Sequence, residues 1–427
     1  MPALFNRRRL TRLSGFAGVQ LVVQLVGFAA GIVLVRTMEP VQYGYYTLAV
    51  SMAAVAAVLA DLGVGTAVLA IGGRLAGGPA ERGQLLAQAL TLQGCLLALA
   101  VAVAAPAALF LLLRQGTPLW QALALVALLC STAALQVRAA AALSVARLLG
   151  HLAVQQRLEM AVNAGKLGVL IWLAVHGASV LDASAACLVN LLVAAIYLLT
   201  MRRHSAVYAP RPQGPMHSHR QALLAHVFKQ APNSIYYLLS SQIGVWLIGI
   251  FGTAQRVAEV GALGRLAAVF ALLSAVGVAL VQPYFARHHA RAELQSGLAS
   301  VNLFFAFLLV ALLTAGAAEP EAILWVLGGH YGSLQQELLW MLAAATLSAW
   351  GGMLYGVGCA RGWVLPFWIN AVTGVIVIAL TAMSVDLGTV RGTLMLNTAV
   401  AGGGLLVVLG YLWWRLRRSD SLAPALQ

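Results

Sequence analysis

The sequence contains very few charged residues. Only 9% of its 427 residues are Asp, Glu, Lys or Arg, whereas 61% are apolar. An ordinary soluble domain is about 25% charged. Because so few charges cannot cover the water-facing surface of a chain this long, the composition excludes a soluble globular protein. We therefore expect the chain to fold in hydrocarbon rather than in water.

Cysteine is also scarce, and no two cysteines have the spacing of a disulfide framework or a metal site. Each of the four lies in an apolar run: Cys95, Cys130, Cys187 and Cys359. Such cysteines behave as small apolar side chains, so we expect neither disulfides nor a bound metal. The sequence also lacks a Walker A motif, a Gly-x-Ser-x-Gly turn and a His-Glu-x-x-His motif. We therefore expect no enzyme activity and no cofactor.

Long apolar runs make up much of the sequence, and its mean hydropathy is +0.89. Within lipid every backbone N–H and C=O must be bonded internally, which leaves helix bundles or closed β-barrels. Barrel strands alternate polar and apolar residues over about ten positions. Runs such as 94–113 instead stay apolar for about 20 residues, the length of a membrane-spanning helix. The sequence predicts an all-α integral membrane protein.

The apolar runs give twelve candidate membrane spans. They are residues 15–35, 45–70, 85–113, 119–147, 152–176, 179–200, 230–251, 262–285, 297–317, 335–360, 364–384 and 390–414. The only long connection, residues 201–229, contains several prolines and divides the spans into two groups of six. We expect a six-helix lobe at 1–200, a cytoplasmic linker at 201–229, a second six-helix lobe at 230–418 and a short tail at 419–427.

The distribution of positive charge predicts the orientation of these spans. The chain has 26 basic and 12 acidic residues, a formal charge of +14. With the N-terminus in the cytoplasm, 19 basic residues fall in cytoplasmic segments and five on the opposite side. This asymmetry follows the positive-inside rule, so both termini are expected in the cytoplasm. Because the excess charge lies next to membrane lipids, we expect no nucleic-acid partner.

Ionisable side chains within spans are the candidate functional residues, because each costs about 2.5–3.5 kcal/mol at a helix centre. They are Asp61, Arg138, Glu159 and Lys166. Arg138 and Lys166 each lie nine residues from a basic residue at the cytoplasmic end of a span, which predicts similar depths. Asn163 shares a helix face with Glu159 and Lys166, because helical residues three or four apart are neighbours.

This pattern has two interpretations. In the first, Arg138, Lys166 and Asn163 line a cationic cavity for an anionic substrate. In the second, Asp61 and Glu159 pair with the two cations, and the pairs only fix the packing of the helices.

Two stretches resemble polysaccharide exporters of the multidrug/oligosaccharidyl-lipid/polysaccharide superfamily, which includes the O-antigen flippases. In that family an Arg lies at the end of the first span and a Pro follows it. An aromatic residue and a Gly then lie at the start of the second span. The matching stretches are Val35-Arg36-Thr37-Met38-Glu39-Pro40-Val41-Gln42-Tyr43-Gly44 and Ala60-Asp61-Leu62-Gly63-Val64-Gly65. The resemblance implies two six-helix lobes, as in multidrug (MATE) transporters. It also implies that the protein flips an undecaprenyl-diphosphate-linked oligosaccharide across the cell inner membrane.

The resemblance also implies roles for particular residues. Arg36 joins Arg138, Lys166 and Asn163 as an expected substrate contact. Many relatives have an acidic residue in the seventh span, where this chain reads Ser241-Gln242-Ile243-Gly244. Asp61 and Glu159 therefore remain as candidates to couple transport to H⁺ or Na⁺. The expected partners are the lipid-linked glycan, membrane lipids, and polysaccharide polymerase and chain-length proteins.

Two other functions remain open at this point. A cation-coupled drug or metabolite exporter of the same fold would have an acidic rather than a basic cavity lining. A polysaccharide polymerase or ligase would need catalytic residues outside the membrane, where the chain has only short segments.

Overall fold

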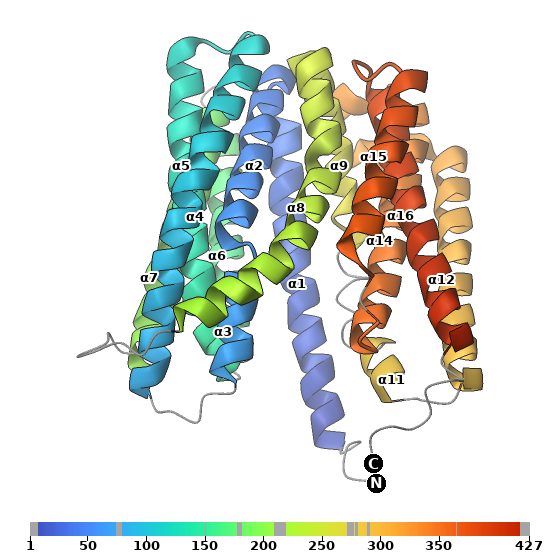
Figure 1. Ribbon diagram of the computed structural model, residues 1–427. Helices are drawn as coiled ribbons and strands as arrows, with labels where there is room; N and C mark the ends of the chain where they lie inside the picture. Colours follow the sequence, from blue (N-terminus) through green and yellow to red (C-terminus); the bar gives the residue numbers. More distant parts are fainter. Residues whose placement is uncertain are drawn as a thin grey trace. The chain divides into compact units, whose positions relative to one another are not determined.

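The chain folds into a set of long helices, as the computed structural model shows (Figure 1). The structure describes residues 7–73, 79–149, 151–176, 182–208, 219–270, 277, 281–287, 291–363 and 365–418. The helices of the first half are α1 (Arg7–Thr37), α2 (Pro40–Asp61), α3 (Val64–Gly72), α4 (Pro79–Arg114), α5 (Leu119–Leu148), α6 (Leu152–His176) and α7 (Ala183–Tyr208). Those of the second half are α8 (Arg220–Phe251), α9 (Ala254–Ala267), α11 (Gln282–Arg287), α12 (Arg291–Ala318), α13 (Pro320–Trp325), η2 (Gly329–Tyr331), α14 (Gln335–Ala360), α15 (Phe367–Ser384) and α16 (Val390–Arg418).

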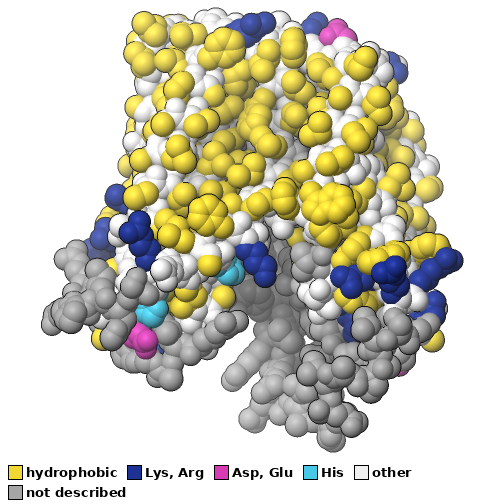
Figure 2. Space-filling model, viewed as in Figure 1, with side chains coloured by type: hydrophobic (Ala, Val, Ile, Leu, Met, Phe, Trp, Pro, Cys, Tyr) yellow, Lys and Arg dark blue, Asp and Glu magenta, His cyan; other side chains and the backbone are white. Residues whose placement is uncertain are grey.

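The lengths and compositions of these helices suit a lipid bilayer. Within the described residues, ten helical segments are long and apolar enough to cross a membrane, and Leu21–Thr37 of α1 is a shorter apolar segment. Large apolar side chains also remain exposed on the surface, among them Leu99 at 65% and Leu380 at 64%. Figure 2 shows that such side chains cover the middle of the visible face, whereas Lys and Arg gather near its edges. The predicted fold class, an all-α multi-pass membrane protein, is confirmed.

Two predicted spans differ from the helices that are observed. The span predicted at 45–70 is divided, because α2 ends at Asp61 and α3 begins at Val64. The span predicted at 262–285 corresponds to α9 and α11, and most of residues 271–280 between them lie outside the described part of the chain.

The helices on either side of the central connection are longer than predicted. Helix α7 continues to Tyr208, and α8 already begins at Arg220, so both ends of the predicted linker at 201–229 are helical. The apolar run ends near residue 200, but the first helix-breaking residue after it is Pro210. The end of the apolar run marks the limit of the hydrocarbon rather than the end of the helix.

Contacts among the helices group them into two compact units. Unit 1 comprises Met1–Phe28 and Glu259–Gln427, and unit 2 comprises Ala29–Ala258. Helix α8 belongs to unit 2, where it packs against α2, α3 and α4. The lobe boundaries at 1–200 and 230–418 remain a prediction.

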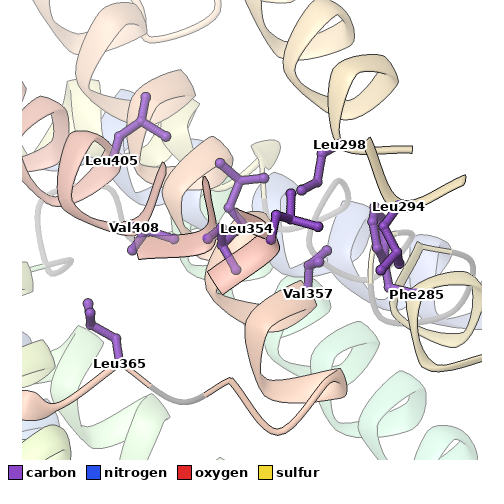
Figure 3. Packing of buried hydrophobic residues seen from close by; sticks show 10 residues of the cluster. Phe285, Leu294, Leu298, Leu354, Val357, Leu365, Leu405 and Val408 are labelled. Atoms are coloured by element: carbon purple, nitrogen blue, oxygen red, sulfur yellow. The ribbon is translucent and has the colours of Figure 1, made fainter. Parts of the chain in front are cut away.

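Unit 1 has an apolar core in which α14 packs along α16 (Figure 3). Leu354 and Val357 of α14 lie with Leu405 of α16 and Leu298 of α12 in one buried cluster. These side chains recur at helical spacing, so each helix presents one apolar stripe to its neighbours. The same cluster continues to the end of α16 through Leu412, which is 2% exposed.

Unit 2 is packed through small side chains. Ala56 of α2, Ala104 of α4 and Ala133 of α5 form one buried cluster. Gly44 of α2 lies directly against the backbone carbonyl of Ala254, where a Cβ would overlap the carbonyl oxygen. Small residues allow this close approach, which is how helices gain packing energy when the surrounding lipid is as apolar as the protein.

The break between α2 and α3 has a specific backbone geometry. Leu62 and Gly63 both have positive φ, at 37° and 89°. The Oδ1 atom of Asp61 accepts a hydrogen bond from the N–H of Gly65 at 3.0 Å. The first amides of a helix have no hydrogen-bond acceptor within that helix. The Asp61 carboxylate supplies an acceptor for the Gly65 amide within the apolar span. The break is therefore a stable element of the fold.

We expect Gly63→Ala to lower the free energy of unfolding by about 2 kcal/mol, because a Cβ disfavours positive φ. That Cβ would also lie 2.8 Å from Cγ of Gln230. Thermal unfolding of the purified protein in detergent measures the effect. Gly168→Ala is the matched control, because a Cβ at this α6 position meets nothing within 4 Å. Equal melting temperatures for the two variants would show that the break does not depend on glycine.

Candidate functional site

Unit 2 contains a cavity of about 800 Å³ between α4, α5 and α7. Most of its lining is apolar, with leucine, valine, alanine and glycine side chains from these helices. The polar lining residues are Thr91, Gln93, Arg138, Arg202, Arg203 and Ser205. The lining thus combines three guanidinium groups with an apolar wall and includes no carboxylate among the described residues.

Arg138 is the basic residue of this lining that lies deepest in a predicted span. Its neighbours in sequence, Val137 and Ala139, are each 3% exposed, whereas the Arg138 side chain is exposed to the cavity. Within the described part of the chain, Arg138 has no hydrogen-bond or ion-pair partner. Its five N–H donors are consequently available to a ligand that enters the cavity.

Arg202 and Arg203 add two further positive charges from the last turns of α7. Both side chains are exposed. Ser205, which also lines the cavity, donates a hydrogen bond to the carbonyl of Arg202 at 3.2 Å. Three like charges around one apolar space favour an anion, which would relieve their mutual repulsion.

Gln93 connects this cavity to Asp61. The Gln93 side chain is 1% exposed, and its Nε2 donates to Oδ1 of Asp61 at 2.8 Å. Its Oε1 is buried without a hydrogen-bond partner in the described structure. A buried amide oxygen left unpaired costs about 1–3 kcal/mol. Because Gln93 Oε1 is buried, a ligand in the cavity reaches it only if neighbouring side chains move.

Lys166 and Asn163 do not line this cavity, although Lys166 was expected beside Arg138. Both residues are half-buried on α6. Lys166 and Asp182 both lie near the Cys187 thiol, close to the start of α7. The sequence spacing predicts only the height of a residue along its helix, whereas the direction of the side chain depends on how the helix is rotated against its neighbours.

Glu159 and Arg36 also lie outside this lining. Oε1 of Glu159 accepts a hydrogen bond from Gln155 at 2.7 Å, and Gln155 in turn accepts one from Nε of Arg147 at 3.3 Å. Tyr197 of α7 lies beside the same carboxylate. Arg36 is exposed near the end of α1. Asp61 and Glu159 therefore bind polar groups other than Arg138, so the structure does not form the expected neutralising pairs at this cation.

The sequence interpretation overlooked three residues of the site. Arg202 and Arg203 were assigned to a linker, and Gln93 was not considered. The absence of proline and glycine from 201–208 would have indicated that α7 continues beyond its apolar run and carries both arginines. Gln93 gave no comparable signal, because an isolated glutamine in a span is usually a hydrogen-bond partner of another helix.

Several solved structures are similar in fold to this chain. An inward-facing multidrug resistance MATE family transporter of the MOP superfamily has a TM-score of 0.62 at 16% identity, over 96% of this chain and 100% of that one. The lipid II flippase MurJ in an inward closed conformation has a TM-score of 0.72 at 10% identity, over 95% and 90%. A eukaryotic MATE transporter has a TM-score of 0.54 at 13% identity, over 97% and 98%. No protein-family model and no curated protein matches the sequence. The chain thus has the fold of the MATE transporters and MurJ.

We expect Asp61→Ala to lower the free energy of unfolding by about 2 kcal/mol, because it removes the acceptor of two hydrogen bonds. Asp61→Asn should remain close to the unsubstituted protein, since its amide oxygen can accept the same bonds. Thermal unfolding in detergent separates the two variants. If Asp61→Asn is as unstable as Asp61→Ala, the negative charge rather than the hydrogen bonds stabilises the break between α2 and α3.

Proposed function

We propose that this protein is a flippase of the MOP superfamily. It moves an undecaprenyl-diphosphate-linked oligosaccharide, an O-antigen or exopolysaccharide repeat unit, across the cell inner membrane by alternating access. The observation that carries the proposal is the cavity of unit 2, in which Arg138, Arg202 and Arg203 belong to a mostly apolar lining.

The chemistry of this lining suits a lipid diphosphate. Guanidinium groups bind phosphate oxygens through two parallel hydrogen bonds, and they keep their charge at any physiological pH. A diphosphate in hydrocarbon requires such fixed counter-charges, because an unpaired buried anion is very costly. The apolar wall of the cavity would accommodate the first units of the polyprenyl chain. A water-soluble anion has no apolar chain and would not need such a wall.

The three arginines have distinct roles in this proposal. Arg202 and Arg203, near the end of α7, attract the diphosphate at the cytoplasmic leaflet, where the positive-inside rule places them. Arg138 then holds it deeper in the membrane.

The fold supports this proposal, because a protein of the same fold is named as a lipid II flippase. Lys166, Asn163 and Arg36 remain proposed contacts for the glycan. Asp61 and Glu159 remain proposed sites for a coupling H⁺ or Na⁺. Polysaccharide polymerase and chain-length proteins are the proposed partners, since they would use the translocated repeat unit.

We expect Arg138→Gln to reduce transport at least about tenfold, because it removes charge-assisted hydrogen bonds to the diphosphate. Lys166→Gln should reduce transport less than Arg138→Gln, because Lys166 lies outside the cavity lining and is a proposed contact for the glycan rather than for the diphosphate. Proteoliposomes containing a fluorescent polyprenyl-diphosphate oligosaccharide, with a membrane-impermeant quencher, report how quickly the lipid changes leaflet.

Each variant is reconstituted in the same amount. Its melting temperature is compared with that of the unsubstituted protein as a control for folding. Unchanged transport by Arg138→Gln would contradict the assignment of this cavity to the substrate. Equal losses in both variants would show that the diphosphate depends on Lys166 of α6 as much as on Arg138, as the sequence pattern predicted.

A cation-coupled drug or metabolite exporter is the second candidate, because two of the compared structures are MATE transporters. It would favour a cationic substrate, which the three arginines of the described lining would repel. We therefore expect a strain lacking the protein to lose surface polysaccharide while its susceptibility to cationic drugs stays unchanged. Increased drug susceptibility with normal polysaccharide would favour the exporter.

A further inference from the structure

The last two turns of α16 carry an unusual series of aromatic and basic residues. Tyr411, Trp413 and Trp414 are each followed four residues later by an arginine: Arg415, Arg417 and Arg418. Residues four apart lie on the same face of a helix, one above the other. We call these six residues the arginine–aromatic surface.

The side chains of this surface are stacked in pairs. The guanidinium carbon of Arg417 lies 3.4 Å from the ring centroid of Trp413, and that of Arg418 lies 4.5 Å from the ring centroid of Trp414. Arg415 lies 5.5 Å from the ring of Tyr411, and its Nε donates to the Tyr411 hydroxyl at 3.0 Å. The rings of Trp413 and Trp414 lie beside the guanidinium groups of Arg417 and Arg418, which limits the motion of these groups.

The surface is firmly supported by the core of unit 1. Leu412 and Leu416 lie between its members and are 2% and 5% exposed, within the cluster shown in part in Figure 3. Trp413 and Trp414 are 56% and 41% exposed on the other side of the helix. The buried leucines therefore hold α16 in place. Trp413, Trp414, Arg417 and Arg418 are exposed, whereas Tyr411 and Arg415 are half-buried and Tyr411 packs against the core.

Unit 1 contains a second arginine–tryptophan pair. The guanidinium carbon of Arg361 lies 5.1 Å from the ring centroid of Trp363, in the turn that follows α14. This turn packs against α16, because Gly358 approaches both the carbonyl of Trp363 and a methyl group of Leu412. Tryptophan and arginine thus meet at the ends of two neighbouring membrane helices.

We propose that the arginine–aromatic surface binds the headgroups of anionic phospholipids such as phosphatidylglycerol. Tryptophan rings prefer the level of the headgroups, where one part of the ring is apolar and the other is wet. At that level the positive charges of Arg415, Arg417 and Arg418 lie next to lipid phosphates, and the exposed rings of Trp413 and Trp414 lie along the upper acyl chains. A neutral headgroup would offer the same phosphate without the net negative charge that three arginines attract.

Native mass spectrometry of the purified full-length protein tests this proposal, with phosphatidylglycerol and phosphatidylcholine as probes. We expect tighter binding of phosphatidylglycerol than of phosphatidylcholine. Arg417→Gln should weaken the binding of phosphatidylglycerol about fivefold, because it removes one positive charge next to an anionic headgroup. Arg391→Gln is the matched control, because it makes the same change at the opposite end of α16 and should leave the binding unchanged.

Trp413→Leu separates stacking from charge, since it keeps every arginine but removes the ring beneath Arg417. We expect a weaker affinity for phosphatidylglycerol in this variant also, with an unchanged melting temperature because the ring is largely exposed. Equal binding of the two lipids by the unsubstituted protein would overturn the proposal. So would an affinity for phosphatidylglycerol that neither Arg417→Gln nor Trp413→Leu reduces.

Discussion

The structure depends on the rule that each backbone N–H and C=O must be hydrogen-bonded within the protein wherever lipid surrounds it. Long helices satisfy this rule through their own bonds. The interruption after Asp61 is the informative exception, because a side chain must supply what the helix no longer provides. Asp61 bonds the backbone of Gly65 and also holds Gln93 on α4. One carboxylate thus allows a break within the apolar span and fixes it to a neighbouring helix.

Composition and hydropathy were sufficient to predict the fold class, because both reflect the solvent directly. The extent of individual helices was less predictable. Helix α7 passes beyond its apolar run to Tyr208, since water does not end a helix that contains no proline or glycine. The break at Gly63 lies within an apolar run. Hydropathy does not change at the break, so it could not predict it. Only the sequence Asp61-Leu62-Gly63, with a capping residue and a glycine together, carried that information.

The candidate site was predictable in its charge but not in its membership. Ionisable residues within apolar runs are rare enough that Arg138 was identified from sequence alone. Its companions depend on which helices are neighbours, and that is a property of tertiary packing. Lys166 lies on α6 and outside the cavity, whereas Arg202 and Arg203 reach it from α7. Similar depth along two helices does not bring two side chains together unless the helices also present facing sides.

Two groups of arginines among the described residues lie in different environments, and the difference bears on what each group can bind. Those at the end of α16 lie on aromatic rings, which hold the guanidinium groups in place without neutralising them. Such groups are preorganised for an abundant ligand that diffuses along the membrane surface. Arg138 has no ring beside it among the cavity-lining residues, and apolar side chains surround it instead. An arginine in that setting gains most from a ligand that carries its own negative charge into the cavity, because the charge and the guanidinium then remove each other's desolvation cost.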